Sequence, residues 1–209
     1  MNRKIFFLCG MLSPALYIIM TILGGALRPG YSHISDTVSE LFSPGAPNKL
    51  LLDILHTTTA LLTVLFGIGV LQFVRGSEHK ELIGLPIGII GAGMIITMGV
   101  ANVATATIFP QDAWGAPPTL PGQMHKILVF GVLGPLSILS TLLIGIWLKR
   151  ADVFPGFGTY SFITVGVIVL SGGFAGATLG TPIMGLTERI VVLAGSQWTF
   201  MLALRMFLR

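Results

Sequence analysis

Apolar residues form six long runs along the chain, and short polar segments separate these runs. Each run has roughly the 20 residues that an α-helix needs to cross the hydrocarbon core of a bilayer. In lipid the backbone must satisfy its hydrogen bonds internally, which favours helices over isolated strands. The pattern therefore predicts an all-α polytopic membrane protein, a six-transmembrane-helix bundle that forms one domain over residues 1–209, with spans at residues 5–27, 50–74, 83–108, 121–148, 158–179 and 182–208.

The composition agrees with this pattern. Hydrophobic residues make up 53% of the chain and charged residues 10%, whereas about a quarter of the residues in soluble domains are charged. The single cysteine, Cys9, excludes a disulfide within the chain. We expect the first run to be retained as a helix, because it is longer than the apolar part of a signal peptide and no A-x-A-type cleavage site follows it.

The distribution of positive charge predicts the orientation, because Lys and Arg gather in cytoplasmic loops. If the N-terminus is inside, eight of the 12 Lys and Arg residues lie on the inner side and four lie on the outer side, namely Arg28, Lys49, Lys126 and Arg189. This count predicts that both termini are inside (N-in/C-in) in the cell membrane. We attribute the net charge of +4 to the Lys and Arg residues of these loops and not to nucleic-acid binding. The expected partner is therefore the lipid bilayer. His79 falls in a charged inner turn, where we expect it to be solvated.

The first outer loop holds much of the polar chemistry of the chain. Its stretch "YSHISDTVSELFSP" has four serines, one histidine and two acids. Ser35 or Asp36 is a candidate N-cap for a short helix from Thr37 onward, with Glu40 in its first turn. We also expect this loop to fold over the bundle as a lid or a wall and to supply a site with His33, Ser35 and Asp36.

Four of the predicted helices place a polar side chain at a similar depth. At a rise of 1.5 Å per residue, these positions lie about 6–9 Å below the outer helix ends; they are His56, Asn102, His125 and Glu188. Asp53 lies one turn above His56 on the same helix face. Ionisable groups at this depth normally face the bundle interior and mark function. The convergence predicts a polar pocket that opens outward.

One hypothesis for this pocket is a metal-assisted or acid–base hydrolase that acts on a lipid or another hydrophobic substrate. Zinc takes His and carboxylate ligands and activates a bound water. The candidate ligands are His33, Asp36, Asp53, His56 and His125. The candidate catalytic residues are Glu188 as general base, Arg189 as the group that holds an anion or oxyanion, and Asp112. The candidate substrate-binding residues are Ser35, Asn102 and Arg189.

Other functions fit the same residues. The pocket would serve a binding, sensing or transport protein if Arg189 held an anionic small molecule or a lipid without chemistry. His56 and His125 would serve as the two axial ligands of a b-type haem. The polar residues would also serve as structural glue between helices, with Asp53 and His56 as a buried pair and Glu188 or Arg189 paired with Asp112. No H-E-x-x-H, P-loop, G-x-S-x-G or C-x-x-C motif decides among these functions.

The order of the short motifs supplies a resemblance. These motifs are "PGYSHISDTVSELFSPGAPN", then "FPQD" and "GQMH", and finally "GLTERI" with Trp198 ten residues after Glu188. Together they span nearly the whole chain and resemble the domain-of-unknown-function 998 family of small bacterial and archaeal membrane proteins. The resemblance implies about six spans and supports the choice of polar residues, but it implies no activity.

Overall fold

The computed structural model describes residues 3–77 and 86–209, and the regular elements of this part of the chain are all helical. His79 lies outside these described residues. Within the described residues six helices are long and apolar enough to cross a membrane, which confirms the predicted all-α bundle of six spans. The elements are α1 (Arg3–Leu27), η1 (Val38–Phe42), α2 (Lys49–Arg75), α3 (Ile87–Thr107), α4 (Leu120–Lys126), η2 (Ile127–Leu133), α5 (Gly134–Arg150), α6 (Phe157–Ala177) and α7 (Met184–Phe207).

The fourth span is continuous over Leu120–Arg150, although it changes helix type within its length. Thr119 caps its start by accepting a hydrogen bond from the Gly122 N–H, and Pro121 occupies the first turn. The segment η2 is a π-helix, in which Gly134 donates to the carbonyl of Val129. Pro135 explains this widening, because proline has no N–H and its ring clashes with the carbonyl four residues earlier.

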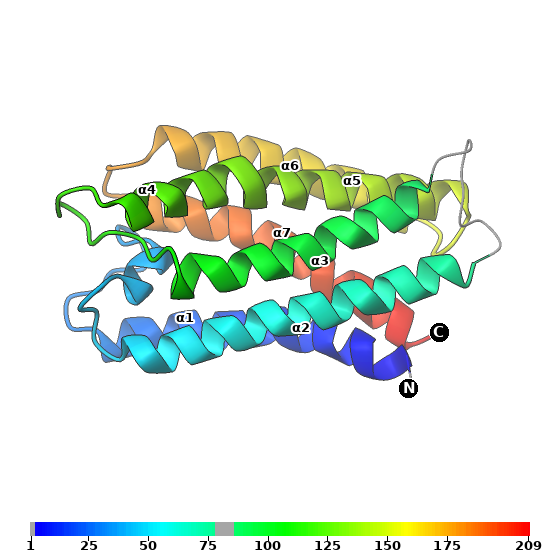
Figure 1. The fold of residues 1–209 in the computed structure, drawn as a ribbon. Helices are drawn as coiled ribbons and strands as arrows, with labels where there is room; N and C mark the ends of the chain where they lie inside the picture. Colours follow the sequence, from blue (N-terminus) through cyan, green and yellow to red (C-terminus); the bar gives the residue numbers. More distant parts are fainter. Residues whose placement is uncertain (1–2, 78–85) are drawn as a thin grey trace.

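The six spans form a closed ring. Each span packs against the next along the chain, and α7 completes the ring by packing against both α6 and α1. Figure 1 shows both termini at one end of the ring, as an even number of spans requires. At the other end lie η1, the loop before α4 and the connection from α6 to α7. We call the segment of residues 31–43 the cap segment, and the end of the ring where it lies the cap end.

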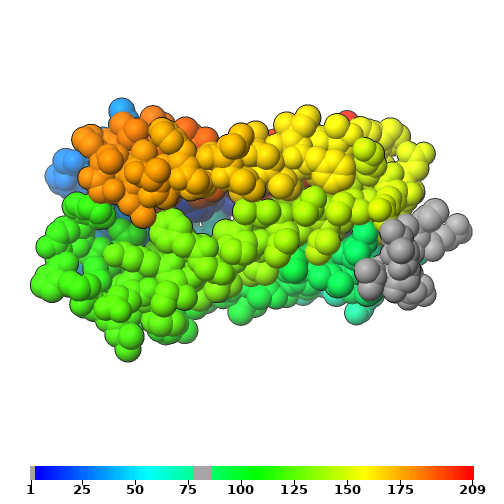
Figure 2. Space-filling view, turned by 90° about the horizontal axis from the view of Figure 1, so that it is seen from above, coloured from blue at the N-terminus to red at the C-terminus, as the bar shows by residue number. Residues whose placement is uncertain are grey.

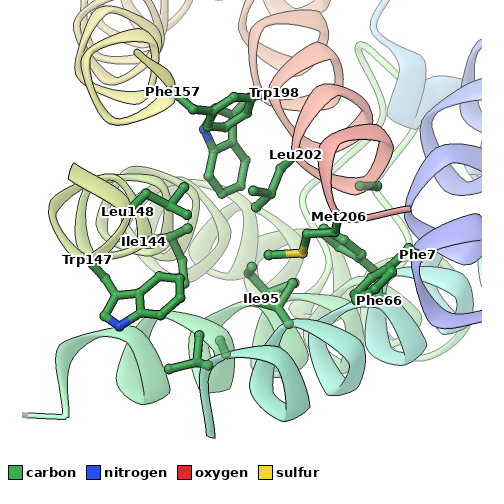
Figure 3. Packing of buried hydrophobic residues seen from close by; sticks show 14 of the residues in the cluster. Phe7, Phe66, Ile95, Ile144, Trp147, Leu148, Phe157, Trp198, Leu202 and Met206 are labelled. Atoms are coloured by element: carbon green, nitrogen blue, oxygen red, sulfur yellow. The ribbon is translucent and has the colours of Figure 1, made fainter. Parts of the chain in front are cut away.

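Two apolar clusters fill the ring. The larger cluster occupies the end near the termini and draws on all six spans, as Figure 3 shows for Phe7, Phe66, Ile95, Ile144, Trp147, Leu148, Phe157, Trp198, Leu202 and Met206. The smaller cluster lies at the cap end and joins η1 to α1 and α2 through Met20, Val38, Leu41, Phe42 and Leu52. The cap segment therefore supplies the apolar side chains that close one end of the ring.

The ring is loosest along α6. The buried residues of this helix end at Ile168, and its later half is exposed, including Leu170 and Phe174. Figure 2 shows the molecular face hollowed between this later half of α6 and the α4–α5 span, and atoms from early in the chain are visible within the hollow. In a bilayer such a hollow opens sideways toward the lipid chains.

Candidate functional site

The cap segment is folded by its own polar side chains. Asp36 accepts hydrogen bonds from the Ser32 N–H (2.8 Å) and from the Ser35 hydroxyl (3.0 Å). The N–H of Thr37 donates to the Glu40 carboxylate at 3.0 Å. The predicted short helix exists, but Thr37 is its N-cap, in place of Ser35 or Asp36. The acceptor atoms of Asp36 thus bind neighbours in the loop.

Arg189 on α7 fastens the cap segment to the ring. Its Nη1 donates to the carbonyl oxygens of His33 (2.9 Å), Asp36 (2.8 Å) and Gly185 (2.8 Å), and its Nη2 donates to the Tyr31 hydroxyl. These acceptors are all neutral. Lys49–Asp53 is the only ion pair within 4 Å among residues 3–77 and 86–209, so the half-buried guanidinium charge of Arg189 is not neutralised by direct contact with a carboxylate.

Glu188 binds the cap segment beside Arg189. Its Oε2 accepts a hydrogen bond of 2.8 Å from the Val38 N–H, at the start of η1. The structure does not bring Glu188 or Arg189 to Asp112, the pairing that the structural alternative for these residues predicted. Asp112 instead accepts from the Thr119 N–H (2.9 Å) and hydroxyl (2.6 Å), and these bonds lower the pKa of its carboxyl group.

The aromatic side chains of Tyr31 and His33, both in the cap segment, complete the surroundings of Arg189. Burial raises the pKa of Tyr31 to about 12, so its hydroxyl keeps its proton and donates to the Thr37 carbonyl at 2.9 Å. His33 stands edge-on to Tyr31 with the ring centroids 5.2 Å apart, and it lies over Gly25 of α1. Burial and then the neighbouring Arg189 lower the pKa of His33. The imidazole is therefore neutral near pH 7, next to a permanent positive charge.

A groove of about 210 Å³ begins at this charged corner. Arg189 and His33 form its polar part, and α1 and α7 form the rest of its wall with Tyr17, Ile18, Thr21, Ile22, Val192 and Leu193. The walls are mainly apolar, and the groove lies along two membrane-spanning helices. The arrangement suits a molecule with a charged head and an apolar chain.

A second group of polar contacts lies where the cap segment meets α4. His125 is buried, with Nδ1 at 2.8 Å from the Phe109 carbonyl oxygen and Nε2 at 3.1 Å from the Ser39 hydroxyl. Gln111 donates from its side-chain amide to the Thr37 hydroxyl at 3.1 Å. The residues "FPQD" and "GQMH" thus meet the cap segment on a different side from Arg189.

The remaining predicted site residues are not gathered at one point. His56 is buried with its ring centroid 5.1 Å from that of Phe42, and its Nδ1 has no hydrogen-bond partner. Asp53 pairs with Lys49 at 2.6 Å. Asn102 donates from its side-chain amide to the Met98 carbonyl of its own helix.

The predicted metal ligands are also dispersed. Within the described residues, His, Cys, Asp and Glu form no group of three or more that fits a metal ion. Asp36 binds its own loop, His33 lies at the groove, and His125 binds Ser39 and backbone carbonyls. The residues do not fit a zinc centre, and both ring nitrogens of His125 already have protein partners, so the geometry gives no support to haem ligation.

Sequence reasoning missed four residues of the cap end. Tyr17 and Tyr31 lie near Arg189, and Gln111 and Ser39 lie near α4. Tyr31, Ser39 and Gln111 lie in stretches that the sequence already singled out. The side of the cap segment that each contacts depends on how the loop crosses the ring, and no spacing in the sequence specifies that path.

Comparisons with known proteins give one match. The family described as "Protein of unknown function (DUF998)" matches residues 11–205, which is nearly the whole chain. Neither the curated proteins nor the solved structures contain a match to this chain.

Proposed function

The chain belongs to the DUF998 family of proteins of unknown function, and from that premise we propose that it is a membrane protein that binds an anionic lipid. Arg189 and His33 receive the charged head, and the groove between α1 and α7 receives part of the acyl chain. Recognition is the proposed role of this site, and no reaction is assigned to the groove.

The observation that carries the proposal is the joining of a cationic corner to an apolar groove. A groove along membrane-spanning helices meets lipid chains by default, so its apolar walls alone select nothing. The guanidinium at one end adds selectivity, because Arg forms strong, directional hydrogen bonds with phosphate and carboxylate groups.

The charge balance supports an anionic rather than a neutral head. The acceptors that Arg189 contacts are carbonyl and hydroxyl oxygens, and a cation in or near lipid is costly unless an anion or a polar surround compensates it. The neutral His33 ring offers a hydrogen bond without a second positive charge. An anionic head would give the guanidinium the direct ionic partner that its protein contacts do not provide.

Thermal unfolding of the purified protein in detergent micelles tests the proposal. We expect phosphatidylglycerol to raise the melting temperature in a concentration-dependent way and phosphatidylcholine to raise it less, because only a ligand that prefers the folded state stabilises it. Val192→Trp fills the groove from its α7 wall and leaves Arg189 and His33 in the sequence, and it should remove the difference between the two lipids. Val100→Trp is the matched control on α3, where Val100 is 58% exposed and lies outside the groove.

Two results would contradict lipid binding at this site. One is equal stabilisation of the wild-type protein by the two lipids. The other is a lipid preference that survives in Val192→Trp while that variant still unfolds cooperatively.

A further inference from the structure

We propose that Ser39 and His125 form a nucleophile–base pair that hydrolyses a long-chain acyl ester. The pair lies where the cap segment meets α4, whereas the lipid groove lies between α1 and α7. The inference therefore does not rest on the proposed lipid binding, and each proposal stands or fails by its own experiment.

The hydrogen bonds of His125 fix which ring nitrogen carries the proton. Nδ1 lies 2.8 Å from the Phe109 carbonyl oxygen and 3.2 Å from the Thr105 carbonyl oxygen. Carbonyl oxygens only accept hydrogen bonds, so Nδ1 is protonated. In the neutral ring Nε2 then has a free lone pair, and the Ser39 hydroxyl at 3.1 Å donates to it.

This arrangement meets the geometric requirements of an activated serine. The nucleophile and the base lie within hydrogen-bond reach, and a third group orients the base. In the Ser-His-Asp triad a carboxylate accepts the Nδ1 proton and stabilises the imidazolium. Here two carbonyl dipoles, from Thr105 and Phe109, take that position.

The surroundings of the pair favour a substrate with a long acyl chain. Ser39 is only half-buried, whereas His125 is 6% exposed. His125 lies on the span that borders the hollow in Figure 2, opposite the later half of α6. That half of α6 exposes apolar side chains, among them Leu170 and Phe174, and an apolar surface of this kind suits a long acyl chain.

The reaction balances with water as the second substrate. The Ser39 oxygen bonds to the ester carbonyl carbon while its proton passes to His125 Nε2. The bond from that carbon to the alcohol oxygen then breaks, the alcohol leaves with the proton from His125, and an acyl-serine remains. His125 next removes a proton from water, whose oxygen attacks the acyl carbonyl, and Ser39 recovers its proton as the fatty acid leaves.

Labelling with an alkyl fluorophosphonate, followed by peptide mass spectrometry, tests the pair. We expect the probe to modify Ser39 in the wild-type protein and not in Ser39→Ala. Ser35→Ala is the matched control, because Ser35 bonds to Asp36 and not to a histidine, and it should label like the wild type. His125→Gln should slow labelling by about 100-fold or more, the usual contribution of a general base. An unmodified Ser39 in folded wild-type protein, or an equal rate in His125→Gln, overturns the proposal.

A second pair of variants keeps His125 and therefore tests the proposal even if His125→Gln does not fold. Ser39→Cys should react with an alkyl chloroacetamide about ten times faster than Ser35→Cys, because an adjacent imidazole favours the thiolate. The natural Cys9 is buried and gives little background. Equal rates would mean that the Ser39–His125 hydrogen bond only holds the cap segment in place, and they would overturn the proposal.

Discussion

Glu40 is a buried acid at the centre of the cap segment, and it makes folding depend on pH. Burial raises the pKa of its carboxyl group, although the Thr37 N–H bond opposes that shift. A raised pKa means that the folded protein favours the neutral form of Glu40. The protein is therefore most stable, as far as Glu40 is concerned, below the ordinary pKa of a carboxyl group, and it loses this stability as the pH rises through the raised pKa.

Glu40→Gln should remove that loss. The glutamine carbonyl still accepts the Thr37 N–H bond but carries no charge, so the variant should gain melting temperature relative to the wild type as the pH rises from 4 to 8. Thermal unfolding of both proteins across this range measures the difference, and Asp152→Asn, at an exposed turn between α5 and α6, is the control. Parallel curves for Glu40→Gln and the wild type would refute the assignment.

The residue types of the cap end were predictable, but most of their contacts were not. Asp36, Asp53 and Asp112 stood out as acids in an apolar chain, and each binds a partner no more than seven residues away. Because these carboxylates bind local partners, they are not free to converge on one common site. Ser35 was singled out and Ser39 was not, because only the path of the backbone over the ring decides which serine reaches His125.

At the scale of elements, the apolar runs located the six spans to within a few residues. The short helix η1 was also predicted, although the predicted N-cap was Ser35 or Asp36 and the observed N-cap is Thr37. The π-helical segment η2 was not predicted. Its cause, Pro135, is visible in the sequence, but a proline within a span is compatible with a kink, a break or a π-bulge. Packing around the proline selects among these outcomes.

The cap segment approaches α7 so closely that Gly185 cannot carry a side chain. A Cβ at this position would lie 2.2 Å from the Asp36 carbonyl oxygen and 2.9 Å from Arg189 Nη1. Gly185→Ala should therefore push the cap segment away and lower the free energy of unfolding by about 1–3 kcal/mol, as overpacking does. Thermal or denaturant unfolding measures the loss.

Gly172→Ala is the matched control for this substitution. Gly172 lies within α6 with no atom within 4 Å of an added Cβ. Alanine there should leave stability unchanged or raise it by up to about 1 kcal/mol, because glycine is a poor helix former. If the two variants unfold alike, the tight approach at Gly185 does not hold the cap segment in place.

At the scale of the whole molecule, the two ends of the ring are stabilised in different ways. The end near the termini has a large apolar core with contributions from six spans. The cap end has a smaller cluster and is fastened by hydrogen bonds from α7, α4 and the loop before α4. Regions with fewer buried apolar contacts open more readily. Both proposed sites lie at this end, where a ligand has the least packing to displace.

The orientation of the ring decides which compartment meets the cap end. The excess of Lys and Arg at the end near the termini predicts that this end is cytoplasmic. Ala116→Cys, in the exposed loop before α4, should therefore react with a membrane-impermeant maleimide in intact spheroplasts, whereas Pro155→Cys, in the exposed turn before α6, should react only after permeabilisation. The buried Cys9 should stay unlabelled in both variants. The opposite pattern would place the cap segment in the cytoplasm, and the lipid groove and the Ser39–His125 pair would then draw on the inner leaflet.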